Sequence, residues 1–124
     1  MIIPLVIVLD QISKIIAVKL GFVTSCNTGF AFGIAPGFLT TLISFLVLGV
    51  VFYLARREKR QEFLFGYYLI LGGGLSNLID RLLHGCVLDF INLKIWPNFN
   101  LADASISVGV GLLIILFVKG FKNA

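Results

Sequence analysis

The chain has 124 residues, of which 59% are hydrophobic and 13% are charged, and its mean hydropathy is +1.05. A soluble domain of this size needs more polar residues to cover its surface, so we expect a lipid bilayer around it. The net charge of +4 does not indicate nucleic-acid binding, because the basic residues cluster beside apolar runs. We therefore predict a single membrane domain over residues 1–124.

The first predicted element is a helix over residues 1–19, interrupted by a polar band that runs from Asp10 to Lys14. The apolar stretch before Asp10 gives only about 13 Å of helix, so we expect a short and tilted span. It lacks the features of a cleavable signal peptide, and we expect it to stay attached. Asp10 and Lys14 are one turn apart, so either they neutralise each other or Lys14 meets a lipid phosphate.

Three further spans are predicted at residues 38–55, 63–83 and 101–118, which makes a four-helix, all-α membrane protein. Basic residues cluster after the second and fourth spans, at Arg56, Arg57, Lys59, Arg60, Lys119 and Lys122. Because Lys and Arg are enriched on the cytoplasmic side, we expect this cluster and both termini to lie inside.

The other two connectors, residues 21–37 and 84–100, are then expected outside the cytoplasm. Both carry aromatic residues among turn formers, which favours ordered structure and a small β-like connector. Residues 22–32 are compatible with a short hairpin, and residues 87–95 suit a surface helix or a strand.

Cys26 and Cys86 lie in these two connectors and match no metal-ligand spacing. A disulfide could persist there, and the sequence leaves open whether they pair. His84 has no partner at ligand spacing, so we predict neither a metal nor a cofactor.

Four of the six acidic residues are aspartates toward the outer ends of the predicted spans, namely Asp10, Asp80, Asp89 and Asp103. Two carboxylates in a poorly hydrated site cannot both ionise cheaply, so they share a proton and act as acid and base. Asp89 and Asp103 are our candidates for such a pair. In the alternative, Asp103 caps the last helix and Asp89 pairs with Lys94.

A second polar group follows the glycine run Gly72–Gly74. Asn77, Asp80 and Arg81 stand at positions i, i+3 and i+4, so they share one helical face. We expect this face to point into the bundle, because a charged group in a membrane needs a partner or water. The glycines permit close approach by substrate or, as we favour, by a neighbouring helix.

Five motifs, in this order, closely resemble those of the bacterial lipoprotein signal peptidases. They are DQISK at 10–14, NTGFAF at 27–32, GGLSNLIDR at 73–81, GCVLDF at 85–90 and FNLAD at 99–103. The resemblance implies an intramembrane aspartic endopeptidase of the signal peptidase II type. Such an enzyme removes the signal peptide from diacylglyceryl-modified prolipoproteins by cleaving before the lipidated cysteine.

By the same resemblance, Asp89 and Asp103 match the catalytic pair of the family. The residues implied to support the pair and hold substrate are Asp10, Lys14, Asn27, Gly29, Asn77, Asp80, Arg81 and Asn100. The implied location is the bacterial cytoplasmic membrane, with the active site near the outer face. The implied partners are lipid-modified prolipoproteins, membrane lipids and globomycin-type inhibitors. The chain looks like a shortened member, because the segment before Asp10 is shorter than is usual in the family.

Two other functions fit part of this pattern. A small proton- or ion-coupled carrier also uses buried aspartates and an arginine, but its key charges belong near the membrane midplane. A non-catalytic membrane assembly factor needs neither paired carboxylates nor Asn100.

Overall fold

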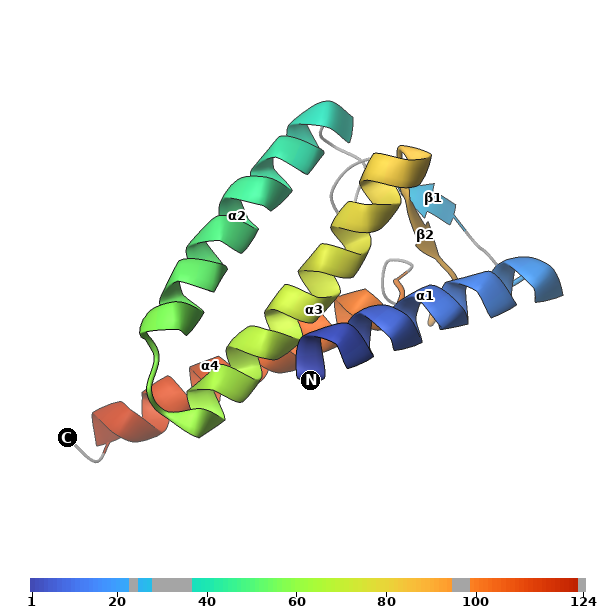
Figure 1. Cartoon of the computed structure of the whole chain (residues 1–124). Coiled ribbons are helices and arrows are strands. Elements are labelled where there is room, and N and C mark those ends of the chain that lie inside the picture. Colours follow the sequence, from blue (N-terminus) through green and yellow to red (C-terminus); the bar gives the residue numbers. More distant parts are fainter. Residues whose placement is uncertain (23–24, 28–36, 95–98, 123–124) are drawn as a thin grey trace.

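The computed structural model describes residues 1–22, 25–27, 37–94 and 99–122 of the chain. These residues form four helices and two short strands: α1 (Ile2–Leu20), β1 (Ser25–Asn27), α2 (Gly37–Arg57), α3 (Gln61–His84), β2 (Val87–Asp89) and α4 (Leu101–Lys122). Helices α1, α2 and α4 all pack against α3, which lies at the centre of the arrangement (Figure 1).

Among the described helices, α2, α3 and α4 are long and apolar enough to cross a membrane. They correspond to the predicted spans at residues 38–55, 63–83 and 101–118, so the mainly helical membrane fold is confirmed. Helix α1 carries three charged residues, Asp10, Lys14 and Lys19, and does not meet the same criterion. That α1 is a fourth span stays a prediction.

The glycine run Gly72–Gly74 near the middle of α3 explains how three helices can pack closely against α3. A Cβ on the first glycine would meet Val6 of α1, one on the second would collide with the carbonyl oxygen of Ala102 in α4, and one on the third would meet Leu48 of α2. Successive helix residues point about 100° apart, so each glycine faces a different neighbour. The predicted packing role of the glycines is confirmed.

Helix α1 runs alongside the second half of α3. Its first turn lies against Gly72, near the midpoint of α3, and Gln11 reaches Ser76 and Asp80 further along. The two helices therefore run in the same direction, toward the end of α3 that leads into β2.

The buried side of α1 is polar, and its exposed side is apolar. Asp10, Lys14 and Ala17 are its buried residues, at spacings of four and three. The large exposed hydrophobic residues include Leu5, Leu9, Ile12, Ile16 and Leu20. This arrangement is the reverse of a helix on a soluble protein, and it suits a helix that faces lipid on its outer side.

Strands β1 and β2 form a two-stranded antiparallel sheet. The paired residues are Ser25 with Asp89, Cys26 with Leu88, and Asn27 with Val87. Gly85, in the left-handed conformation with φ 74°, ends α3 and turns the chain into β2. Residues 25–27 thus pair with a distant segment, and the remainder of the hairpin predicted at 22–32 lies mostly outside the described residues.

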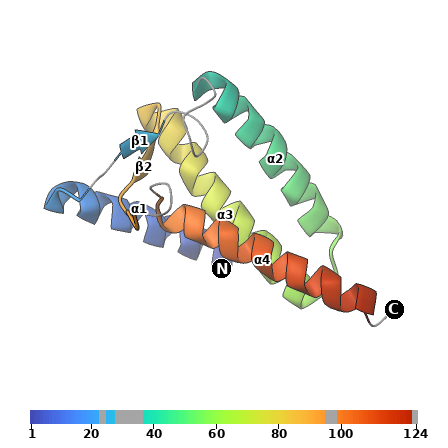
Figure 2. The ribbon, with the colours of Figure 1, turned by 180° about the vertical axis from the view of Figure 1, so that it is seen from behind.

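Cys26 and Cys86 form a disulfide beside this sheet, with their Cα atoms 5.4 Å apart. The pairing that the sequence left open is therefore present in the structure. Seen from behind, the strands lie beside the carboxyl end of α3, whereas the C-terminus lies at the opposite end of the molecule (Figure 2).

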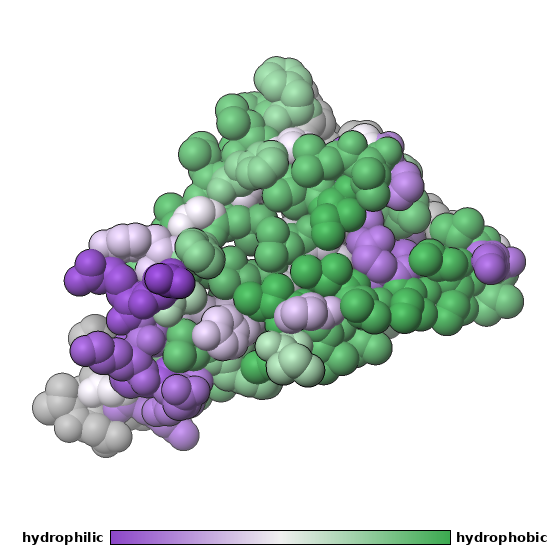
Figure 3. Space-filling model, in the orientation of Figure 1, coloured by the Kyte–Doolittle hydropathy of each residue, from purple (hydrophilic) through white to green (hydrophobic). Residues whose placement is uncertain are grey.

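Hydrophilic residues gather at that opposite end, near the α2–α3 connector, and most of the remaining visible face is hydrophobic (Figure 3). The exposed basic residues of this cationic end are Arg56, Arg57, Lys59, Arg60 and Lys119. Hydrogen bonding from the Arg60 guanidinium lowers the pKa of Glu58 to about 2, so their ion pair at 2.9 Å persists into acid.

Replacing Gly73 by alanine should loosen the contact between α3 and α4. The new Cβ would meet backbone, which cannot rotate away as a flexible side chain can. We expect Gly73→Ala to lower the free energy of unfolding by about 1–3 kcal/mol, measured by thermal unfolding in detergent. Gly111→Ala is the matched control, because a Cβ there meets no described atom within 4 Å. Equal midpoints for the two variants would contradict the packing role.

Candidate active site

Asp89 and Asp103 both hydrogen-bond to Asn100, the residue that precedes α4. The carboxamide nitrogen of Asn100 donates to Asp89 Oδ1 at 3.1 Å, and its backbone N–H donates to Asp103 Oδ2 at 3.2 Å. In return, Asn100 Oδ1 accepts from the backbone N–H of Asp103 at 2.8 Å. The structure therefore brings the two predicted aspartates to one residue, Asp89 from β2 and Asp103 from α4.

The bonds between Asn100 and Asp103 form a capping box at the start of α4. Asp103 thus has the capping role that the sequence allowed, but it also has a second partner. Asn77 Nδ2 of α3 donates to Asp103 Oδ1 at 2.9 Å. Both carboxylate oxygens of Asp103 are held, and its side chain is oriented by two separate elements.

A buried ion cluster lies next to Asn77. Lys14 Nζ is 2.5 Å from Asp10 Oδ2 and 2.6 Å from Asp80 Oδ2, and it donates to Asn77 Oδ1 at 3.2 Å. Lys14 is only 2% exposed. The predicted pairing of Asp10 with Lys14 is confirmed, and the alternative contact of Lys14 with a lipid phosphate is wrong because its ammonium group is buried.

Asp10 fastens α1 to both α3 and α4. It accepts a hydrogen bond from Ser76 Oγ at 2.5 Å and another from the backbone N–H of Ala102 at 2.8 Å. Gln11 adds bonds to Ser76 Oγ and Asp80 Oδ1, both at 2.9 Å. Since Ala102 N–H belongs to the first turn of α4, the carboxylate of Asp10 also benefits from the positive end of that helix.

Gln11 and Ser76 were not predicted as members of the site. Both stand inside the quoted motifs at 10–14 and 73–81, but neither was singled out as a site residue. Ser76 lies one helical turn before Asp80, and this spacing is the signal that could have placed it on the same inward face.

Asn77 connects the ion cluster to the aspartates. Its Oδ1 accepts from Lys14 Nζ at 3.2 Å and from Asn100 Nδ2 at 3.1 Å, while its Nδ2 donates to Asp103. These partners determine the orientation of the carboxamide, with its oxygen toward two donors and its nitrogen toward the carboxylate. An amide does not titrate at ordinary pH, so Asn77 positions Asp103 without exchanging a proton with it.

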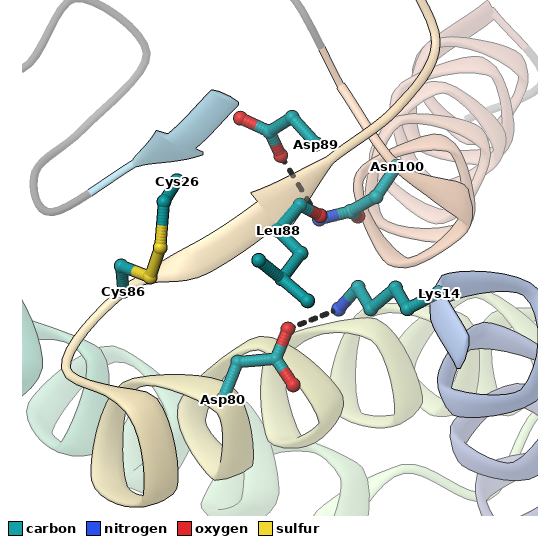
Figure 4. The surroundings of a disulfide bond; sticks show 7 residues. All are labelled: Lys14, Cys26, Asp80, Cys86, Leu88, Asp89 and Asn100. Carbon is teal, nitrogen blue, oxygen red and sulfur yellow. Dashed lines mark hydrogen bonds and ion pairs between the residues drawn. A yellow bond between two sulfur atoms is a disulfide. The ribbon is translucent and has the colours of Figure 1, made fainter. Parts of the chain in front are cut away.

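Strand β2 completes the site on its other side. Asn100 Nδ2 also donates to the carbonyl oxygen of Leu88 at 3.1 Å. Figure 4 shows the Leu88 side chain pointing toward the ion pair of Lys14 and Asp80, with Asp89 on the opposite side of the strand. This alternation is that of an ordinary β-strand.

Of the three remaining predicted site residues, two lie in described elements of the fold. Arg81 is partly buried on α3, directly after Asp80. Asn27 lies in β1, where its backbone is opposite Val87. Gly29 lies outside the described residues.

The site offers two neighbouring carboxylates in different surroundings. Asp89 is 2% exposed, whereas Asp103 is only partly buried. Two carboxyl groups at one site divide acid from base when one of them holds a proton and the other does not. Among the described residues, no group of three or more His, Cys, Asp or Glu is arranged to hold a metal ion.

Comparisons of the sequence with known proteins all find the same family. The family described as "Signal peptidase (SPase) II" matches residues 2–119. A lipoprotein signal peptidase of Thermodesulfovibrio yellowstonii is 38% identical, covering 96% of this chain and 89% of its own length. One from Mycobacterium leprae is 34% identical, covering 94% of this chain and 69% of its own.

Two solved structures have the same fold as this chain. A bacterial membrane enzyme superposes with a TM-score of 0.86 at 29% identity, covering 98% of this chain and 88% of that chain. A second bacterial membrane enzyme has a TM-score of 0.82 at 30% identity, covering 95% and 90%. The fold is therefore shared over nearly the whole of this chain.

Replacing Lys14 by methionine should strongly destabilise the protein. The substitution keeps much of the side-chain volume but leaves Asp10 and Asp80 buried without their cation. Breaking a buried ion pair in this way costs about 3–5 kcal/mol, which chemical unfolding in detergent would measure. Lys19→Met is the matched control on the exposed side of α1, and we expect it to stay within about 0.5 kcal/mol of the parent. A Lys14→Met variant as stable as Lys19→Met would argue against the ion cluster.

Proposed function

Because this chain belongs to the signal peptidase II family, we propose that it removes signal peptides from diacylglyceryl-modified prolipoproteins by cleaving before the lipidated cysteine. Membership in this family makes it a membrane protease of lipoprotein processing. We further propose an aspartic mechanism in which Asp89 and Asp103 are the catalytic pair. The observation that carries this proposal is the contact of both carboxylates with Asn100.

In the proposed mechanism the two aspartates hold one proton between them. The ionised carboxylate takes a proton from a water molecule as that water attacks the scissile carbonyl carbon. The protonated carboxyl donates to the carbonyl oxygen, and the proton taken from water later goes to the leaving amine. Each step needs two carboxyl groups of opposite protonation, and a shared neighbour such as Asn100 keeps the pair together.

The surrounding residues have distinct roles in this proposal. Asn100 orients Asp89 through its side chain, and Asn77 orients Asp103. The partial exposure of Asp103 gives water a route to the pair. By their likeness to the family motifs, Arg81, Asn27 and Gly29 are proposed to hold the substrate, and globomycin-type inhibitors are proposed to occupy the same site.

We propose that the protein lies in the bacterial cytoplasmic membrane with the aspartate pair near the outer face. The cationic end at the α2–α3 connector is expected inside, since basic residues are retained on the cytoplasmic side. Asp89 lies beyond the end of α3, and Asp103 lies in the first turn of α4, away from the cationic end (Figures 1 and 3). This position supports a peptidase more than a carrier, whose key charges belong near the midplane. A lipid-anchored substrate would reach such a site from within the bilayer.

Asp89→Asn and Asp103→Asn should each abolish cleavage of a diacylglyceryl-modified prolipoprotein by the purified protein in detergent. Asparagine keeps the shape of the side chain but can neither take up nor release the shared proton. We expect kcat to fall by at least about 10²–10⁴-fold, with the helical fold retained. Glu62→Gln, at the distant first turn of α3, should keep full activity. An unchanged rate in either aspartate variant, or a requirement for added metal, would refute the proposed pair.

The orientation can be tested separately by cysteine labelling in intact cells. We expect a membrane-impermeant maleimide to label Leu93→Cys, beyond β2, but not Lys59→Cys in the α2–α3 connector. The two native cysteines are joined and should not react. Permeabilised cells should label both variants, which controls for reactivity. Labelling of Lys59→Cys alone in intact cells would contradict the proposed orientation and indicate the opposite one.

A further inference from the structure

We propose that the disulfide between Cys26 and Cys86 positions Asp89, so that the oxidised chain is the fully active form of the peptidase. This inference rests on the function proposed above and adds a positioning role for two residues outside the aspartate pair. Figure 4 shows the disulfide linking Cys26 of β1 to Cys86, the residue just before the strand β2 that carries Asp89, with Asn100 nearby.

The sheet that carries Asp89 is small, and the chain just beyond it is also held by backbone hydrogen bonds of Phe90 and Ile91 with Phe99. The sheet has two strands and three residue pairs, and an isolated two-stranded ribbon is marginally stable at best. Cys26 is the central residue of β1, and Cys86 immediately precedes β2. The covalent link therefore fixes the position and register of a pairing that three residue pairs specify weakly.

The link joins an exposed strand to a buried one. Cys86 and Val87 are 5% and 3% exposed, respectively, where the chain leaves the end of α3, whereas Cys26 is exposed. The start of β2 is thus held by packing, and β1 is held to it by the disulfide. Asp89, at the far end of β2, has Ser25 of β1 as its paired residue. If the disulfide is lost, β1 can move away from β2, and β2 then loses its neighbour on that edge.

The contacts of Asp89 with Asn100 depend on where β2 lies. Asn100 Nδ2 donates both to the carbonyl oxygen of Leu88 and to Asp89 Oδ1, each at 3.1 Å. A shift of the strand by about 1 Å would lengthen both bonds beyond useful range. The bonds of Asn77 and Asn100 to Asp103 involve no atom of β2. Release of the strands should therefore displace Asp89 while Asp103 keeps its orientation.

This difference separates a positioning role from a general stabilising role. If the link positions Asp89, its loss lowers kcat while the helices remain folded and substrate binding changes little. If it only stabilises the fold, its loss lowers the unfolding midpoint without changing kcat at temperatures where the protein is folded. The exposed Cys26 gives a dithiol access to the bond. Reduction transfers two electrons and two protons from the dithiol to the disulfide, which yields two protein thiols and an oxidised, cyclic reductant.

The test uses the purified full chain in detergent, with maleimide labelling to count free thiols. Before reduction we expect no labelling, and after treatment with a dithiol we expect two labelled cysteines. Complete reduction should lower kcat by about ten- to a hundredfold, with KM and the helical circular-dichroism signal nearly unchanged. Reoxidation should restore kcat. The chain has only two cysteines, so the dithiol has no other thiol or disulfide target in the protein.

The double variant Cys26→Ser/Cys86→Ser is the matched control. It should show the lowered kcat of the reduced parent and no response to the dithiol. Two free thiols in the untreated protein, full kcat after complete reduction, or loss of helical signal on reduction would each overturn the proposal. If the oxidised parent cleaves no prolipoprotein, the proposed function fails instead. Amide hydrogen exchange at Val87–Asp89 then decides on the disulfide alone: faster exchange on reduction supports it, and unchanged exchange rejects it.

Discussion

A single buried ammonium group sets the arrangement on which the rest of the site depends. Lys14 is shielded from water, and its charge is tolerable only because two carboxylates and an amide oxygen surround it. These partners come from α1 and α3, and Asp10 extends the same network to the backbone of α4. Pairing one charge therefore aligns three helices. The start of α4, where Asn100 and Asp103 lie, is positioned as a result.

The two aspartates are then held in different ways. Asp103 belongs to a helix end that is capped and bonded to α3, so its position follows from the helix bundle. Asp89 ends a three-residue strand, so its position follows from the small sheet, from Asn100 and from the bonds of the next two residues to Phe99. Asn100 thus bonds to one carboxylate held by the helix bundle, Asp103, and to one held by the small sheet, Asp89. This division explains why a short connector matters as much to the candidate site as the helices do.

The sequence predicted what local patterns can encode. Apolar runs predicted α2, α3 and α4, and the i, i+4 spacing made a contact of Asp10 with Lys14 one of two alternatives. The second carboxylate at Lys14, Asp80, could not be predicted, because it depends on α1 lying beside the second half of α3. The β1–β2 pairing left no signal either, since three-residue strands far apart in the chain have no periodicity. A turn motif near Asn27 favoured local pairing instead.

The glycine run of α3 has a consequence for genetic variation. Bulk added at Gly72 or Gly74 meets the side chains of Val6 and Leu48, so a smaller residue at the partner position can act as a second-site suppressor. Bulk added at Gly73 meets the carbonyl oxygen of Ala102, and no change of side chain removes a backbone atom. The three adjacent glycines therefore differ in the substitutions they can tolerate. Gly72 and Gly74 can be replaced if the partner side chain becomes smaller, whereas Gly73 has no side-chain change that compensates.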